Sequence, residues 1–178
     1  IVQAGIKRVF VGSDDPNPLV AGKGIQYLRE RGIAVETHVL KEECDQLNPV
    51  FFHFIRRKAP YVVMKYAMTL DGKIAAYTGA SKWVTGEEAR AYVQQERHRY
   101  RGIMVGVGTV LADAPMLNCR MPGGRNPVRI ICDTHLRTPL TSRIVRTAKE
   151  ISTILAVCET DRARYQPYEE AGCRILTL

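Results

Sequence analysis

The sequence predicts an α/β protein with parallel strand pairing, organised as two domains. Strand and helix signals alternate along its 178 residues, and repeated strand–helix–strand units favour a parallel sheet with helices on its faces. A basic run at residues 56–58, followed by Pro60, divides the chain, so we expect one domain over residues 1–58 and a second over residues 59–178. No segment of about 18 apolar residues is present that could span a bilayer.

The first domain is expected to hold two strands and two helical stretches. Residues 6–11 form a short apolar run and residues 33–40 alternate apolar and polar side chains, and both patterns are typical of strands. Residues 24–31 have a helical pattern between them. Residues 42–58 are also helical in pattern, and Pro49 is predicted to bend or split that helix.

The second domain begins with an apolar stretch, residues 61–68, that predicts a buried strand. The pair Asp71-Gly72 follows and is a strong turn signal. A helix is expected over residues 85–100, with Thr85 and Glu88 as a capping box.

Short strands and helices alternate over the rest of this domain. Strands are predicted at residues 103–107, 128–132, 153–158 and 174–178, and helical segments at residues 106–111, 142–149 and 161–171, the last despite Pro167. The chain starts at Ile1 and stops inside the last of these strands. We therefore expect it to be part of a longer protein.

The net charge and the cysteine spacing limit the kinds of partner and metal site that this chain can have. The net charge is +8, from 26 Lys and Arg against 18 Asp and Glu, which favours an anionic partner or is simply a well-solvated surface. Five cysteines without a C-x-x-C spacing and four histidines without a ligand spacing predict no metal site in this chain. Free thiols are the simplest interpretation, and they indicate a reducing cytoplasm.

Three side chains stand out as candidates for chemistry. Arg97 continues the apolar stripe of the helix at 85–100, so it either points inward to an anion or lies with its stem on the core and its head in water. Lys65 interrupts the apolar strand at 61–68 and indicates either a pocket or an exposed edge. Trp83, the single tryptophan, either staples the helix entry or covers a planar ligand.

Several motifs, in this order, resemble one family. Lys65-Tyr66-Ala67-Met68-Thr69-Leu70-Asp71-Gly72-Lys73, Gly79-x-Ser81-x-Trp83-Val84-Thr85, Arg97 and Gly108-Thr109-Val110-Leu111-Ala112-Asp113-Ala114-Pro115-x-Leu117-Asn118-x-Arg120 are similar to the bifunctional riboflavin-biosynthesis deaminase–reductases. Residues 12–24, which contain Asp15-Pro16-Asn17-Pro18, resemble the last part of the deaminase domain of that family. The resemblance covers essentially the whole chain.

The resemblance implies both a fold and a function. It implies the C-terminal piece of a cytidine-deaminase-like domain, followed by most of a dihydrofolate-reductase-like domain that uses NADPH. The implied reaction reduces the ribosylamino side chain of 5-amino-6-(5-phosphoribosylamino)uracil to ribitylamino. Zinc is expected only in an N-terminal deaminase part outside these residues, because the His-Ala-Glu and Pro-Cys motifs of that part are absent here. The glycine-rich segment that ends the family's reductase site is absent as well.

The resemblance also implies roles for individual residues, carried over by position. The substrate contacts are Ser81, Arg97, Leu117 and Arg120, with Asp15 and Asn17 at the rim of the deaminase pocket. The NADPH contacts are Ala67, Trp83, Thr109, Asp113 and Thr134. Lys65 is expected to polarise or protonate the opened sugar as it accepts hydride, and Asp113 to orient Lys65 or the ribose.

Two alternative functions fit the sequence less well. The first is a single-function reductase of the same fold, which the deaminase-like segment at residues 12–24 argues against. The second is a basic nucleic-acid-binding module, which the scattered basic residues and the aromatic fraction of 7% argue against. We expect a phosphorylated small-molecule partner, no nucleic acid and no membrane. Homo-oligomerisation is left open.

Overall fold

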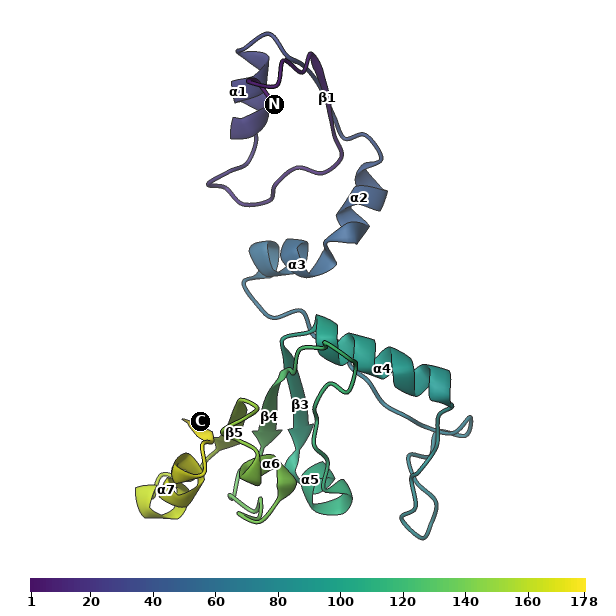
Figure 1. The fold of residues 1–178 in the computed structure, drawn as a ribbon, viewed down its shortest axis with the longest axis vertical. Helices are drawn as coiled ribbons and strands as arrows, with labels where there is room; N and C mark the ends of the chain where they lie inside the picture. The colour runs from purple at the N-terminus through teal and green to yellow at the C-terminus, as the bar shows by residue number, and fades with distance from the viewer. The chain divides into compact units, whose positions relative to one another are not determined.

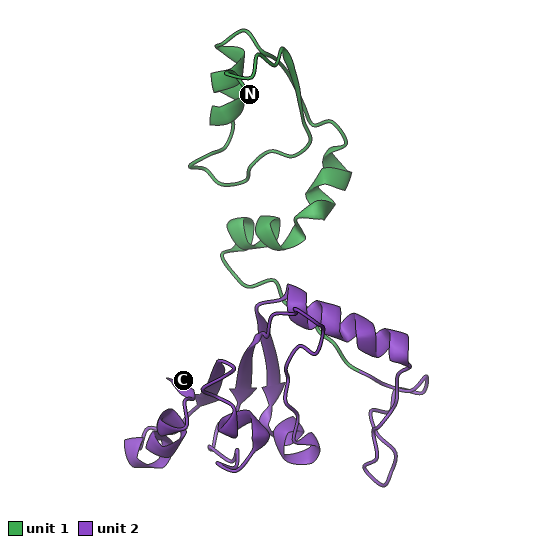
Figure 2. Ribbon diagram, viewed as in Figure 1, with its two compact units in different colours: residues 1–66 green, residues 67–178 purple.

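The computed structural model describes residues 1–178, which form two compact units. Unit 1 spans Ile1–Tyr66 and unit 2 spans Ala67–Leu178 (Figure 2). The predicted domain boundary after residue 58 remains a prediction.

Unit 1 contains a two-stranded parallel sheet. Strands β1 (Arg8–Val11) and β2 (Ala34–Thr37) pair with Arg8 opposite Ala34, and helix α1 (Lys23–Arg29) connects them (Figure 1). The predicted strands and the helix between them are confirmed, each shorter than expected. At the end of β1, Gly12 is required by a close approach, since a Cβ atom there would lie 2.2 Å from the sulfur of Cys44.

The predicted long helix of unit 1 is split in two. Helix α2 (Lys41–Leu47) ends at Asn48 and helix α3 (Pro49–Arg57) begins at the proline. Proline has no N–H to donate and is well placed in a first helical turn, so it starts one helix and ends the other. Phe52 on α3 is buried.

Unit 2 is built on a four-stranded parallel sheet. Its strands are β3 (Gly102–Gly106), β4 (Val128–Cys132), β5 (Thr153–Val157) and β6 (Arg174–Thr177). They lie in the order β3-β4-β5-β6, and every neighbouring pair is parallel. All four predicted strands and their parallel pairing are therefore confirmed.

Four helices belong to unit 2. They are α4 (Glu87–Arg99), α5 (Val107–Asp113), α6 (Arg143–Arg146) and α7 (Arg162–Glu170). The side chains of Ser142 and Asp161 cap α6 and α7 by accepting backbone hydrogen bonds from Val145 and Ala163. Figure 1 shows α5 and α6 near the carboxyl ends of β3 and β4.

One face of this sheet and the short helices form the core of unit 2. Ile131 of β4 and Leu155 of β5 are completely buried, as are Ile144 and Val145 of α6. The other face of the sheet is more open, because Met104 of β3 is 63% exposed. The apolar alternation of the strands therefore has one well-covered side.

Two sequence-based expectations for the second predicted domain are wrong. Residues 61–68 form no strand, and Val62 is 82% exposed, because no other strand of the chain pairs with this segment. The capping box is also absent, since the N-cap of α4 is Gly86 and no side chain caps it. The helix begins one residue later than predicted, so Thr85 is not the N-cap residue. A capping box needs its Ser or Thr at the N-cap and its Glu three residues further on, and Thr85 and Glu88 therefore do not form one.

Candidate functional site

Helix α4 holds the loop that follows α5 by two neighbouring side chains. Nη1 of Arg97 donates a hydrogen bond to the carbonyl oxygen of Asn118 over 2.9 Å. Oε1 of Gln94 accepts a hydrogen bond from the backbone N–H of Arg120 over 3.0 Å. Residues 94 and 97 share one helical face, so α4 fixes the backbone on both sides of Cys119.

The structure turns the guanidinium of Arg97 inward, against the loop after α5, and its binding of an anion stays a prediction. Its Nε is buried and has no hydrogen-bond partner, and no carboxylate pairs with its guanidinium. Burial, and secondly the charge of Arg120, lower the pKa of Arg97 below its ordinary value. Two guanidinium groups without an acidic partner leave the positive charge of this loop uncompensated.

The same loop contains further buried polar and strained backbone groups. Leu117 adopts a left-handed backbone conformation with φ of 51° and its side chain is buried in the core. Its side chain is therefore enclosed by the apolar core, and a role of Leu117 in substrate binding stays a prediction. Oδ1 of Asn118 is buried without a partner beside the Arg97 contact.

A second feature is a hollow formed by residues 69–84. It has a volume of about 710 Å³, and its lining includes Ser81, Trp83, Tyr77 and Asp71. The Asp71-Gly72 turn that shapes it is confirmed by a hydrogen bond of 2.9 Å from Gly72 N–H to Thr69 carbonyl oxygen. The structure thus brings two of the predicted site residues, Ser81 and Trp83, into one hollow.

Trp83 is 68% exposed, so it does not act as a buried staple of the helix. The guanidinium of Arg90 lies 4.6 Å from the centre of its ring, which is a cation–π distance. Nη1 of Arg90 also donates to the carbonyl oxygen of Thr85 over 2.5 Å. The side chain of Arg90 is therefore half-buried against Trp83.

The predicted cofactor residues Thr109 and Thr134 both follow neighbouring parallel strands. Gly106 at the end of β3 is in register with Cys132 at the end of β4. Thr109 on α5 and Thr134 after β4 therefore lie beyond the same edge of the sheet, where open α/β sheets bind ligands. Asp113, at the end of α5, is exposed.

The turn that carries Thr134 is fixed by a buried carboxylate that the sequence analysis missed. Asp133 is completely buried, and its oxygens accept hydrogen bonds from the N–H of Arg137 at 2.9 Å and from the N–H and hydroxyl of Thr138 at 2.7 Å each. An Asp at the end of a strand, followed by polar residues, is the pattern of a side-chain-capped turn. That pattern was present in residues 133–138 and could have identified it.

Two predicted residues lie near the division between the units. Lys65 is exposed in the irregular segment that precedes Ala67, so it does not interrupt a buried strand as expected. Ala67 is half-buried and is the first residue of unit 2. The catalytic role of Lys65 stays a prediction.

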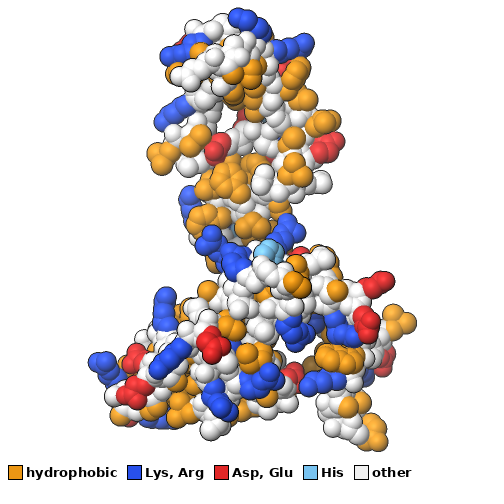
Figure 3. All heavy atoms as spheres, viewed as in Figure 1, with side chains coloured by type: hydrophobic (Ala, Val, Ile, Leu, Met, Phe, Trp, Pro, Cys, Tyr) orange, Lys and Arg blue, Asp and Glu red, His pale blue; other side chains and the backbone are white.

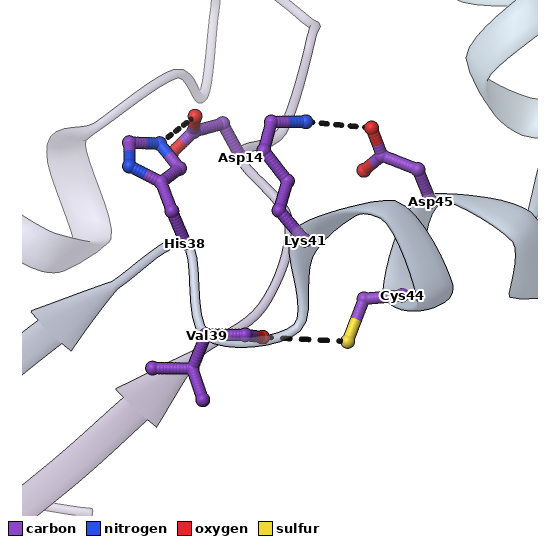
Figure 4. Close-up of polar contacts among 6 residues, drawn as sticks. All are labelled: Asp14, His38, Val39, Lys41, Cys44 and Asp45. Carbon is purple, nitrogen blue, oxygen red and sulfur yellow. Dashed lines mark hydrogen bonds and ion pairs between the residues drawn. The ribbon is translucent and has the colours of Figure 1, made fainter.

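In unit 1, Asp15 and Asn17 stabilise their own loop. A carboxylate oxygen of Asp15 accepts from the N–H of Asn17 at 2.8 Å, and Oδ1 of Asn17 accepts from the N–H of Leu19 at 3.1 Å. Next to them, Nε2 of His38 lies 2.6 Å from a carboxylate oxygen of Asp14 (Figure 4). The predicted rim residues therefore sit in a loop whose shape their side chains determine.

Figure 4 also shows the start of α2, where Lys41 and Asp45 pair at 2.6 Å. The hydrogen bond from Lys41 lowers the pKa of Asp45 below its usual value. This is an ordinary pairing four residues apart on a helix.

The structure gathers no group of three or more His, Cys, Asp or Glu side chains that could hold a metal ion. All five cysteines are free thiols. Basic side chains are spread over both units on the face drawn in Figure 3 instead of forming one stripe. No helix is long and apolar enough to cross a membrane.

The chain is similar over nearly its whole length to known proteins. It is 58% identical over 176 residues to the riboflavin biosynthesis protein RibD of Actinobacillus pleuropneumoniae, covering 99% of this chain and 47% of that protein. It is 45% identical over 179 residues to RibD of Bacillus amyloliquefaciens, covering 100% of this chain and 48% of that protein. The chain thus spans about half the length of the curated relatives it matches.

Solved structures agree with these relatives. A deaminase/5-amino-6-(5-phosphoribosylamino)uracil reductase from Thermotoga maritima matches with a TM-score of 0.83 and 35% identity, over 99% of this chain and 55% of that one. RibD of Acinetobacter baumannii matches with a TM-score of 0.85 and 35% identity, over 99% of this chain and 49% of that one.

The four-stranded parallel sheet with its helices has the α/β fold of these solved structures. Residues 60–176 match the family described as the RibD C-terminal domain. The chain belongs to that family, as its motifs predicted.

Proposed function

We propose that this chain is part of a riboflavin-biosynthesis enzyme that reduces the ribosylamino side chain of 5-amino-6-(5-phosphoribosylamino)uracil with NADPH and that also contains a zinc-dependent deaminase. The observation that carries the proposal is the arginine pair of unit 2. Arg97 is buried at Nε without a partner, and Arg120 is exposed, makes no ion pair and acts on Arg97 by its charge. A phosphate group supplies the anion that such a pair lacks.

In this proposal Arg97 and Arg120 bind the 5′-phosphate of the substrate. Guanidinium groups donate paired hydrogen bonds to phosphate oxygens, and burial strengthens them because little water competes. The backbone of Leu117 and the hydroxyl of Ser81 are proposed to contact the sugar and the pyrimidine. Asp15 and Asn17 are proposed to contribute hydrogen bonds at the rim of the deaminase pocket.

The residues present fit a nicotinamide dinucleotide. The exposed ring of Trp83 offers a flat surface beside a hollow of about 710 Å³, and two threonine hydroxyls follow the neighbouring strands β3 and β4. We propose that Ala67, Trp83, Thr109, Asp113 and Thr134 hold NADPH, which supplies the hydride when bound. The ammonium group of Lys65 is proposed to hold the proton that the reduced sugar needs, and Asp113 to orient Lys65 or the ribose.

The bifunctional form is favoured over a reductase alone. The match to the Actinobacillus relative covers 99% of this chain and so runs through both units. A single-function reductase has no use for the Asp15-Pro16-Asn17-Pro18 loop of unit 1. We place the enzyme in the cytoplasm, since its five cysteines are unpaired.

The test is NADPH oxidation by the full-length protein with 5-amino-6-(5-phosphoribosylamino)uracil, with the same compound lacking its phosphate as a second substrate. We expect turnover of the first and a much higher KM, by about tenfold or more, for the second, because the phosphate contacts are charge-assisted. Equal KM values for the two would show that the arginine pair does not bind phosphate. No NADPH oxidation with either would refute the reductase function itself.

A further inference from the structure

The backbone of Arg120 is held by a side chain that none of the functional assignments above includes. Oε1 of Gln94 accepts the N–H of Arg120 over 3.0 Å, and the carbonyl oxygen of Gln94 lies 3.5 Å from the sulfur of Cys119. Gln94 is half-buried on α4. Both contacts are made to the loop that carries Arg120.

This contact acts together with Arg97. Arg97 lies one turn further along the same face of α4 and bonds the carbonyl oxygen of Asn118 over 2.9 Å. The loop is thus fixed at residues 118 and 120 by two side chains whose separation the helix sets. The position of Arg120 relative to Arg97 follows from these two bonds.

The positive charges of Arg97 and Arg120 act on each other, and this repulsion disfavours their approach. The charge of Arg120 acts on Arg97, and like charges repel when no anion lies between them. The guanidinium of Arg120 makes no ion pair, so its own side chain does not hold it near Arg97. The bond from the Arg120 N–H to Gln94 fixes the backbone from which the Arg120 side chain projects.

We propose that Gln94 is a positioning residue for phosphate recognition, which orients Arg120 toward Arg97 through the Arg120 N–H and touches no ligand itself. This inference rests on the proposed function of the arginine pair. Gln94 pre-organises the second arginine, so it contributes to binding of the phosphorylated substrate and little to the hydride step.

The test uses the full-length protein and a double-mutant cycle. Gln94→Met keeps the side-chain volume and removes the acceptor, and Gln95→Met makes the same change at the exposed neighbouring position. Arg120→Ala and the double variant complete the cycle. The readouts are kcat and KM with the phosphorylated substrate, the affinity for ribose 5-phosphate by calorimetry, and amide hydrogen exchange of residues 118–121.

We expect Gln94→Met to raise KM and the dissociation constant of ribose 5-phosphate about fivefold to tenfold, as for loss of one hydrogen bond. We expect kcat to change less than about twofold and Gln95→Met to match the wild type. Adding Gln94→Met to Arg120→Ala should change KM less than about twofold, because Gln94 acts through Arg120. Amide exchange at Arg120 should become faster in Gln94→Met and stay slow in Gln94→Glu, which keeps an acceptor oxygen.

Additive effects in the double variant would overturn the proposal, since Gln94 would then act independently of Arg120. Unchanged amide exchange at Arg120 in Gln94→Met would overturn it as well. Both results leave wild-type turnover intact, so they differ from failure of the proposed function, in which the wild type binds no ribose 5-phosphate and oxidises no NADPH. That last outcome would refute both.

Discussion

Nη1 of Arg129 donates a hydrogen bond to the carbonyl oxygen of Met116 over 3.2 Å, and this bond ties β4 to the loop that carries Leu117 and Arg120. Arg129 is completely buried, yet it makes no ion pair. Seven hydrogen bonds, all to carbonyl or threonine oxygens, satisfy its guanidinium. A single side chain thus joins this loop to α6 and to the start of β5.

Removing this side chain should strongly destabilise unit 2. Arg129→Met leaves several buried carbonyl oxygens without donors, and we expect a loss of about 3 kcal/mol or more in the free energy of unfolding. Arg129→Lys should lose about 2 kcal/mol, since an ammonium group cannot reproduce the planar fork. Urea unfolding of the full-length protein measures both. Arg137→Met, at an exposed position, is the control, and a cost for it equal to that of Arg129→Met would contradict the prediction.

Arg97→Ala should weaken substrate binding for reduction. Its guanidinium is half-buried and already bonds the Asn118 carbonyl, so loss of a charge-assisted phosphate contact should cost roughly 1.5–3 kcal/mol in kcat/KM. Steady-state kinetics of reduction and deamination on the same protein sample measure the effect, with Arg99→Ala as the control. A matching decline in deamination would indicate general destabilisation instead.

Lys65→Met should nearly abolish reduction while NADPH still binds. A positioned acid–base group contributes typically about 10²–10⁴-fold, and Lys65 is exposed, so its loss should not disturb packing. Single-turnover NADPH oxidation gives the rate, and quenching of Trp83 fluorescence gives the affinity. Lys7→Met, also at an exposed position, serves as the control. A decrease of less than about tenfold would lie below that range and would remove Lys65 from the chemistry.

Cys173 should be the least reactive thiol of unit 2. Burial raises its pKa to about 11, so almost no thiolate exists near neutral pH. Cys132 and Cys158 are exposed and should be alkylated first, as peptide mapping by mass spectrometry after a timed iodoacetamide pulse would show. Cys173 labelled as fast as Cys158 would disprove this.

The same raised pKa has a consequence for stability. The folded state keeps the Cys173 proton at pH values where the unfolded chain loses it. This contribution is therefore fully present below the unfolded pKa of about 9 and is lost as the pH rises toward the folded value of about 11. Unfolding midpoints measured between these two pH values should fall for the wild type and fall less for Cys173→Ala.

Local patterns were sufficient to predict most of the fold. The residues of β4 and the split of one helix at Pro49 follow from short apolar runs and from proline chemistry. The prediction of a strand at residues 61–68 was wrong because a strand forms only beside another strand. The apolar pattern of a segment does not show whether such a neighbouring strand is present. The predicted N-cap of α4 was wrong because helix ends are predictable only to within one or two residues, and a shift of one residue removes a capping box.

The candidate site was predictable only in part. The helical spacing placed Arg97 on the apolar stripe of its helix, and its guanidinium bonds the loop after α5. Helical spacing alone does not predict the contact between Arg90 and Trp83, because Trp83 lies in the loop before the helix. Arg129 was missed entirely, since a basic residue inside an apolar strand reveals nothing of carbonyl groups supplied by distant loops.

The order of the strands also bears on how unit 2 is made. In the sheet β3-β4-β5-β6, each strand after the first pairs with the strand that precedes it in the chain. The partner of each new strand has therefore already been synthesised. Each pairing joins residues 20 to 26 positions apart, as in Ile154 opposite Arg174 (174 − 154 = 20) and Gly102 opposite Val128 (128 − 102 = 26), so the loop entropy lost is smaller than a non-consecutive strand order would cost. As the ribosome releases the chain, β3 can template β4, β4 can template β5, and β5 can template β6.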